Sequence, residues 1–231
     1  MNFSLIYWFE WSEKHDKMAL TKSEIQNLEK VKRLNIVNSI TGIKPGNLVA
    51  TKSIDGIPNV AIMSSVVHLS SNPALIGFIT RPHGEFRRDT FNNIMETKCF
   101  TINHIHKDII EKAHFTSAKF EQSISEFDSC GLTEEYLENQ YAPFVKESSI
   151  KIGLKYCEHI SIKSSNTTMI VGEIEQLVVP DDIITPDGYI DLSAADSVGI
   201  SGLNSYYDLS FLNSFPYARV QNVTTEWDKN A

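Results

Sequence analysis

The chain has 231 residues, of which 42% are hydrophobic and 22% charged, and its net charge is -8 with an isoelectric point near 5.4. This length is sufficient for one domain with a substantial core. An acidic chain with no basic run longer than two residues, such as Arg87-Arg88, repels a phosphate backbone, so nucleic acid is excluded as an expected partner. The scattered Cys99, Cys130 and Cys157 match no zinc or disulfide pattern, which indicates reduced thiols in a cytoplasmic protein.

The first ten residues form a brief apolar stretch. It is far too short to span a bilayer, which takes about 20 apolar residues, and it lacks the basic start and cleavage site of a signal peptide. Because regular patterning begins near Met18, we expect residues 1–20 to be a loosely ordered N-terminal extension, with Met18 as the natural start. A membrane-surface anchor is the alternative, but no basic amphipathic face follows it. We therefore expect no membrane partner.

The next segment has the pattern of an amphipathic helix. Ser23 and Gln26 have the spacing of a capping box, in which each side chain bonds the backbone of the other. Ile25, Leu28, Val31 and Leu34 then recur at helical spacing. Pro45-Gly46 interrupts the pattern, so the predicted helix ends before it.

From Asn47 onward, short apolar runs alternate with turn residues such as Asp55-Gly56 and Asp187-Gly188. Strands are predicted at 47–53, 60–68, 74–80, 99–103, 150–156, 158–164 and 168–179, and helices at 89–97, 109–114 and 134–138. Many short strands with few inserted helices favour a closed antiparallel barrel over a parallel sheet. We expect one domain over 21–221, with 222–231 as a frayed tail.

An ordered series of motifs runs through residues 47–104. Its members are the Asp55-Gly56 turn, Pro58-Asn59-Val60-Ala61, Ser64-Ser65, Asn72-Pro73, Arg88-Asp89-Thr90, Asn93-Ile94 and Thr101-Ile102-Asn103. In order and spacing, this series resembles the flavin reductase-like family of FMN-binding split barrels, and the similarity continues from about residue 21 to 220. Ala74 and Asp89 depart from the family pattern. The resemblance implies a mainly β, antiparallel Greek-key split barrel that binds FMN, with FAD as the alternative, and acts as a homodimer.

The resemblance assigns the flavin ring to the strand Met63-Ser64-Ser65-Val66. Small side chains let a backbone approach the polar edge of the ring, and the two serine hydroxyls are available to the ring or the ribityl chain. The alternative is two ordinary strand serines.

A phosphate requires positive charge and convergent donors. Arg88, Asp89 and Thr90 at a helix start offer a guanidinium, a hydroxyl and backbone amides, and Arg81 and Arg87 are close in sequence. The Asp89 carboxylate would repel a phosphate unless it caps the helix or pairs with an arginine. The alternative is a solvated basic loop beside a helix start.

By the same resemblance, Asn103 contacts the ribityl chain or ring, and Thr116 and Ser117 lie with His114 near the cofactor or the subunit boundary. His114 and Tyr206 are candidates for lining the nicotinamide side. No obligatory acid or base is expected, because the flavin supplies the redox chemistry.

Two functions remain open: an NAD(P)H-dependent flavin oxidoreductase, and an FMN-binding electron carrier with little nicotinamide activity. A split barrel that has lost its flavin is a third reading. A metal site built from His104, His106, Glu111 and His114 is disfavoured because no HExxH pattern is present. Ser64 and Ser65 with His68 lack the hydrolase elbow, and no dinucleotide-binding glycine motif occurs, so a nicotinamide must bind against the flavin.

Overall fold

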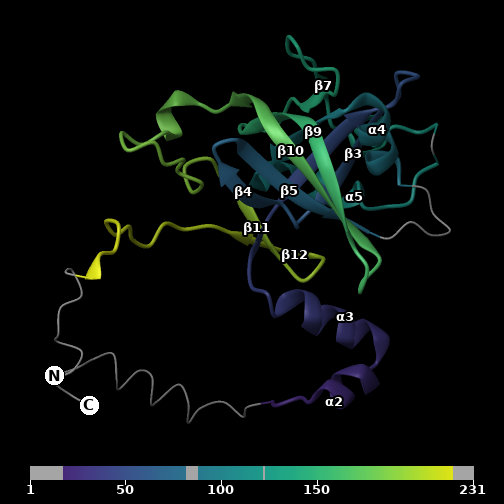
Figure 1. Cartoon of the computed structure of the whole chain (residues 1–231), viewed down its shortest axis with the longest axis vertical. Helices are drawn as coiled ribbons and strands as arrows, with labels where there is room; N and C mark the ends of the chain where they lie inside the picture. The colour runs from purple at the N-terminus through teal and green to yellow at the C-terminus, as the bar shows by residue number, and fades with distance from the viewer. Residues whose placement is uncertain (1–17, 82–87, 122, 221–231) are drawn as a thin grey trace.

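The computed structural model describes residues 18–81, 88–121 and 123–220 (Figure 1). The helical elements are α2 (Lys22–Asn27), α3 (Lys30–Ser39), α4 (Asp89–Thr97), η1 (Lys107–Ile109), α5 (Ile110–Phe115), α6 (Glu126–Cys130) and η2 (Asp181–Ile183). The strands are β1 (Lys44–Pro45), β2 (Asn47–Lys52), β3 (Pro58–Met63), β4 (Val67–Ser71), β5 (Ala74–Thr80), β6 (Cys99–His104), β7 (Glu134–Glu135), β8 (Phe144–Val145), β9 (Lys151–Ile162), β10 (Thr167–Val178), β11 (Val198–Ser201) and β12 (Ser205–Asp208).

The main sheet has seven strands in the order β3-β2-β6-β9-β10-β5-β4, and every neighbouring pair is antiparallel. Its two edge strands, β3 and β4, are consecutive in sequence and only residues 64–66 separate them. The sheet must therefore curl until its edges meet at that connection, although β3 and β4 do not pair with each other. The predicted mainly β, antiparallel split barrel is confirmed, and the expected full closure is not formed.

The alternation of side chains along β2 divides the core between two faces. Leu48 and Ala50 pack with residues of α5 and α6, such as Ala113 and Phe127. Val49 points to the opposite face, where it joins the apolar interior of the barrel. That interior is formed by Phe78, Ile94, Phe100, Ile102, Ile152, Leu154 and Ile170. Ile94 comes from α4, so this helix covers part of the curled sheet while α5 and α6 cover the other face of β2.

The N-terminal helix differs from its prediction. The capping box is formed by Thr21 and Glu24 rather than by Ser23 and Gln26. The helix also breaks in two, because Leu28 is extended and the Glu29 side chain accepts from the amides of Val31 and Lys32, which starts α3. Neither α2 nor α3 contains a buried residue, so the expected apolar face is not packed.

Several boundaries differ in the barrel as well. The predicted strand 60–68 is two strands, interrupted at residues 64–66, whereas the predicted strands 150–156 and 158–164 are one strand. A bulge in the β9–β10 ladder beside Cys157 absorbs the change in pattern without ending β9. The predicted helix at 134–138 is wrong: Glu134 and Glu135 pair with β8, and α6 lies upstream instead.

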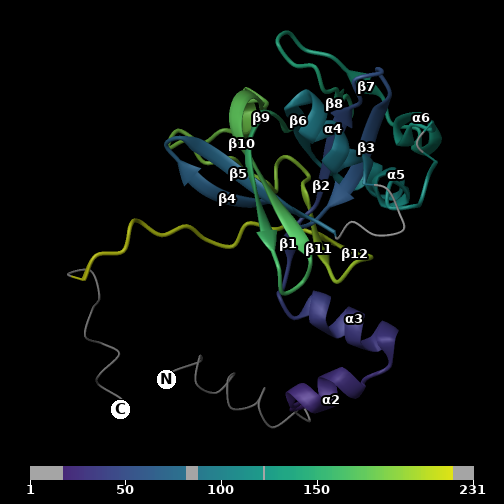
Figure 2. The ribbon, with the colours of Figure 1, turned by 45° about the vertical axis from the view of Figure 1, so that its right-hand side comes forward.

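A small sheet of order β1-β11-β12 lies below the barrel, close to where α3 enters and where the C-terminal segment leaves (Figures 1 and 2). The described residues contain no helix of the length and apolarity needed to cross a membrane. Residues 1–17 of the predicted N-terminal extension and the whole predicted tail, 222–231, lie outside the described ranges.

Candidate functional site

The connection between β3 and β4 holds the residues predicted to line a flavin ring. The Ser65 hydroxyl accepts from the amide of Ile79 at 3.0 Å and donates to the carbonyl of the same residue at 3.2 Å. This hydroxyl thus takes the place of a strand partner for β5 and fixes the β3–β4 connection against that strand. Within the described chain, Ser64 and Val66 form no backbone hydrogen bond, and both are half-buried. Their backbone groups are accordingly the ones that a polar ring edge could contact.

The outer edge of β3 itself is covered by side chains. The Ile62 amide donates to Thr116 Oγ1 at 2.9 Å, and this hydroxyl in turn donates to the Ala113 carbonyl at 2.7 Å. The Val60 amide donates to Glu126 Oε2 at 3.3 Å. A ligand therefore meets the backbone beyond Met63, at residues 64–66, rather than along the strand.

His114 and Tyr206 come together from distant parts of the chain. The Nδ1 atom of His114 lies 3.0 Å from the Tyr206 hydroxyl, and the two rings meet edge to face with centroids 5.9 Å apart. Burial raises the pKa of the Tyr206 hydroxyl. Ile62 and Tyr206 pack against the same apolar cluster, and Thr116, two residues beyond His114, bonds Ile62. The pair consequently lies beside the end of β3 that leads into Ser64.

The start of α4 provides the second half of the predicted site. Arg88 is the N-cap residue, and no side chain among the described residues caps the helix by a hydrogen bond. An N-terminus of this kind presents backbone amides to an anion. The Thr90 hydroxyl does not share this role, because it is buried and donates to Asn59 Oδ1 at 3.0 Å. Arg81 is exposed at the end of β5, two residues after the Ile79 that binds Ser65, whereas Arg87 lies outside the described residues.

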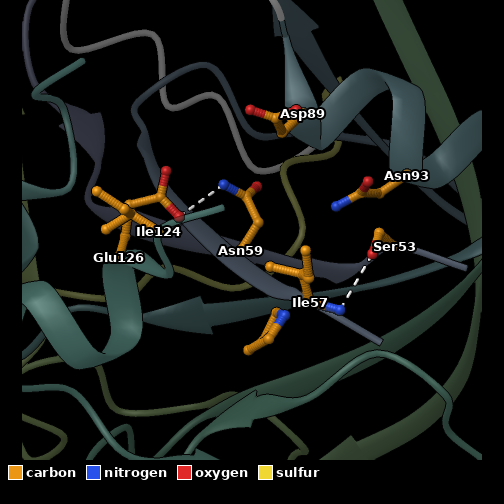
Figure 3. A pocket seen from close by; sticks show the side chains of 8 residues that line it. Ser53, Ile57, Asn59, Asp89, Asn93, Ile124 and Glu126 are labelled. Carbon is orange, nitrogen blue, oxygen red and sulfur yellow. Dashed lines mark hydrogen bonds between the residues drawn. The ribbon is translucent and has the colours of Figure 1, made fainter. Parts of the chain in front are cut away.

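A small polar pocket adjoins this helix start (Figure 3). It is lined by Ser53, Ile57, Pro58, Asn59, Asp89, Asn93, Ile124 and Glu126. Asn59 Nδ2 donates to Glu126 Oε2 at 2.7 Å. Burial raises the pKa of the Glu126 carboxyl and the charge of Asp89 raises it further, while the hydrogen bonds from Asn59 and Val60 lower it. With two carboxyl groups in its lining, this pocket is unsuited to a phosphate.

The same network continues into the barrel. Asn59 Oδ1 accepts from both Thr90 and Thr51, and Asn93 Nδ2 donates to the Thr51 hydroxyl at 3.0 Å. All four side chains are buried. The sequence analysis missed this network, although inward-facing Thr51 and Asn59 within otherwise apolar strands were a signal of paired buried polar groups.

Asn103 and Ser117 do not join the other predicted residues in one place. Asn103 is fully buried, and its amide donates to Leu48 and Thr101 while its carbonyl oxygen accepts from the Val145 amide. These bonds give it a structural role, fastening β6 to β2 and β8. Ser117 is exposed just beyond α5, where its amide donates to the His114 carbonyl.

The three histidines that were weighed as metal ligands bind separate partners. His104 Nδ1 lies 3.3 Å from the Ser197 hydroxyl, His106 Nε2 lies 2.9 Å from the Glu147 carbonyl, and His114 contacts Tyr206. Over residues 18–81, 88–121 and 123–220, no group of three or more His, Cys, Asp or Glu is arranged to hold a metal ion.

Comparison with known proteins agrees with this architecture. Residues 43–192 match the model of the flavin reductase like domain. A solved structure from Shewanella frigidimarina, assigned as a flavin reductase with a split barrel domain, is 44% identical, with a TM-score of 0.84 over 87% of this chain and 100% of the other.

Two further proteins are more distant. Nitrilotriacetate monooxygenase component B from Bacillus cereus is 17% identical and has the same fold, with a TM-score of 0.76 over 87% of this chain and 100% of that one. An uncharacterized protein of Aquifex aeolicus is 28% identical over 170 residues, which are 73% of this chain and 85% of its own. Because the family model matches more than half of the sequence and the structure is a split barrel, the chain belongs to the flavin reductase-like family.

Proposed function

We propose that the protein binds FMN at the β3–β4 connection and the start of α4, and transfers hydride from NADH or NADPH to the flavin and electrons onward to an acceptor. The observation that carries this proposal is the meeting of three predicted segments. Residues 64–66, the His114–Tyr206 pair and the Thr116 hydroxyl adjoin one end of β3. Membership of the flavin reductase-like family supports the same reading.

The residues present fit a flavin mononucleotide. Ser64 and Val66 offer backbone groups outside the sheet ladder to the ring edge. Arg88 and the backbone amides at the start of α4 offer positive charge and donors to a phosphate, and Arg81 follows the strand that Ser65 bonds. Ser65 and Thr116 hold the backbone around this position through hydrogen bonds to Ile79 and Ile62. FAD is the alternative flavin.

Bound FMN supplies the redox chemistry, since its ring accepts hydride and releases electrons. The protein has three tasks. It binds the phosphate with Arg88, aligns the ring through residues 64–66, and keeps one ring face open to a nicotinamide. His114, half-buried and held by Tyr206, is placed to contact that nicotinamide or to donate a proton to the acceptor.

A homodimer in the cytoplasm completes the proposal, with no nucleic-acid or membrane partner. The unpacked apolar residues of α2 and α3 support the dimer, because an exposed apolar face of this kind is typical of a subunit contact.

Anaerobic mixing with each nucleotide tests the function. We expect the purified protein to absorb in the flavin band and to bleach on addition of NADH or NADPH. A bound flavin that stays oxidised with both nucleotides would refute the reductase and leave the second candidate, an FMN-binding electron carrier. A colourless protein that takes up no added FMN would refute both.

A further inference from the structure

The helical hairpin of α2 and α3, residues 18–44, carries apolar side chains that the described part of the chain leaves uncovered. Val31, Leu34 and Val37 are between 43% and 59% exposed, and Ile40 is 81% exposed. Helices of six and ten residues are too short to be stable in water without packing partners. A surface beyond the described part of this chain is therefore needed to cover them.

The hairpin is also basic. It contains Lys22, Lys30, Lys32, Arg33 and Lys44 against Glu24 and Glu29, a net charge of +3 in a chain of net charge -8. Both carboxylates are engaged at helix starts, where Glu24 bonds Thr21 and Glu29 bonds the amides of Val31 and Lys32. The exposed lysines therefore border the apolar side chains, and the expectation that no basic amphipathic face follows the N-terminal stretch is wrong.

A second surface has the opposite character. The loop of residues 181–192 contains Asp181, Asp182, Asp187 and Asp191 and no basic residue, a net charge of -4. Ile184, Tyr189 and Leu192 are 42%, 73% and 40% exposed.

This acidic loop is held in one conformation by packing and by backbone hydrogen bonds. Ile183 and Ile190 anchor it in a satellite core with Ile150 and Ala195. Backbone bonds join Thr185 to Tyr189, and Asp191 to Ile183. An anchored loop can present its exposed side chains to a partner without first becoming ordered.

Within one chain the two surfaces lie apart. The hairpin lies below the barrel, and the loop that follows β10 lies at the upper left of Figure 1, on the side away from the helices; Figure 2 shows the same separation. A contact between them requires two copies. Since every copy carries one hairpin and one loop, a twofold axis closes the pair into a dimer with two identical contacts.

We propose that the basic, apolar α2–α3 hairpin of one copy docks on the acidic, apolar 181–192 loop of a second copy, and the reverse. This inference rests on the homodimer of the proposed function and assigns the surfaces that form it. The apolar side chains supply the buried area, and the charges at the rim speed association and fix the register.

Charge reversal in the full-length protein tests the pairing. One variant carries Lys30→Glu and Lys32→Glu, and a second carries Asp182→Lys and Asp187→Lys, all at exposed positions. Light scattering should give twice the 26.1 kDa chain mass for the unmodified protein. Each variant alone should have a dimer dissociation constant raised by at least about tenfold. An equimolar mixture of the two should regain the dimer, because both contacts in the mixed dimer pair opposite charges.

Lys163→Glu and Glu138→Lys, at exposed positions elsewhere, are the matched controls and should leave the mass unchanged. Three results would each overturn the interface. The unmodified protein could be monomeric or form an open-ended assembly, both charge-reversed variants could keep the mass of the unmodified protein, or the mixture of the two variants could stay monomeric. Flavin absorbance recorded on the same samples separates the two proposals. A colourless dimer that is lost in each variant and regained in the mixture would refute flavin binding alone. A coloured dimer whose mass is unchanged in both variants would refute this interface alone.

Discussion

The hydroxyl of Tyr206 lies 3.0 Å from Nδ1 of His114, and it joins β12 to α5 across 92 residues of sequence. The bond occupies Nδ1 and orients the imidazole so that Nε2 is the nitrogen left for a ligand. We expect Tyr206→Phe, which keeps the ring and loses this bond, to reduce kcat/KM for the nicotinamide by roughly tenfold, equivalent to one hydrogen bond of about 1.4 kcal/mol. Tyr207→Phe, on the neighbouring exposed residue, is the control.

Steady-state rates should be read beside the bound flavin content. Because Tyr206 is assigned to the nicotinamide side, its loss should leave FMN binding unchanged. Equal kcat/KM for Tyr206→Phe and Tyr207→Phe would remove the pair from the reaction.

Arg88 is the N-cap residue of α4 and the charge expected to meet a phosphate. We expect Arg88→Ala to weaken FMN binding about tenfold to a hundredfold, since a hydrogen bond to a charged group contributes about 1.5–3 kcal/mol, and to weaken folding much less. Flavin fluorescence quenching gives the affinity, and melts with and without FMN give the stability. Lys163→Ala controls for loss of a positive charge. A loss of unfolding free energy without FMN as large as the loss of FMN-binding free energy would count against a phosphate role.

The split barrel could be predicted from the sequence because its signals are local. The Asp55-Gly56 turn, the apolar strand 74–80 and the helix 89–97 all depend on neighbouring residues, and all three are found. The hydrogen-bond partners of the hydroxyls could not be predicted from such local signals. Ser65 and Thr90 are polar residues near a predicted ligand, but each bonds a protein group from elsewhere in the chain. Such partners depend on how the sheet curls, which a linear pattern does not encode.

The approach of His114 to Tyr206 could not be predicted for the same reason. Both residues were predicted to line the nicotinamide side, but only the packing of β12 beside α5 brings them within hydrogen-bond distance. The extended conformation at Leu28 also depends on a local competition, in which the Glu29 side chain captures two amides and starts a new helix. Periodicity alone favoured one uninterrupted helix there.

Ser65 contributes to stability in a way that its neighbour does not. Ser65→Ala removes both bonds to Ile79 and leaves a backbone amide and carbonyl without this partner, so we expect the free energy of unfolding to fall by about 1–3 kcal/mol. Ser64→Ala is a matched control, because the Ser64 hydroxyl has no hydrogen bond within the described residues. Urea unfolding of both variants without flavin measures the difference. Equal midpoints would show that the hydroxyl does not stabilise the β3–β4 connection against β5.

Glu126 is a buried carboxyl whose pKa is raised by burial and by the charge of Asp89. Glu126→Gln keeps an oxygen acceptor for Asn59 and removes the buried charge, so we expect it to stabilise the protein modestly at pH 7. The stability advantage of the glutamine variant should shrink as the pH falls and Glu126 itself becomes protonated in the folded state.

Glu126→Ala leaves the Asn59 amide and the Val60 amide without an acceptor and should destabilise the protein by about 1–3 kcal/mol. Urea unfolding across pH distinguishes them, and a Gln variant less stable than the Ala variant would contradict this account.

His104 gives the opposite pH dependence. Burial at the end of β6 lowers its pKa to about 4, from an ordinary value of 6.5. The Asn47 side chain, on the residue opposite His104 in the β2–β6 pair, makes no hydrogen bond within the described chain and offers no charge to compensate an imidazolium. Between pH 6.5 and 4 the His104 side chain binds a proton in the unfolded chain but stays neutral in the folded protein. The free energy of unfolding therefore keeps its full value above pH 6.5 and declines as the pH falls. The loss should reach about 3 kcal/mol near pH 4.

His104→Gln, which does not titrate, should lack this part of the decline in the free energy of unfolding. Unfolding curves of the unmodified protein and of this variant at each pH isolate the contribution of His104. Parallel pH profiles would show that His104 gains a proton in the folded protein as easily as in the unfolded chain.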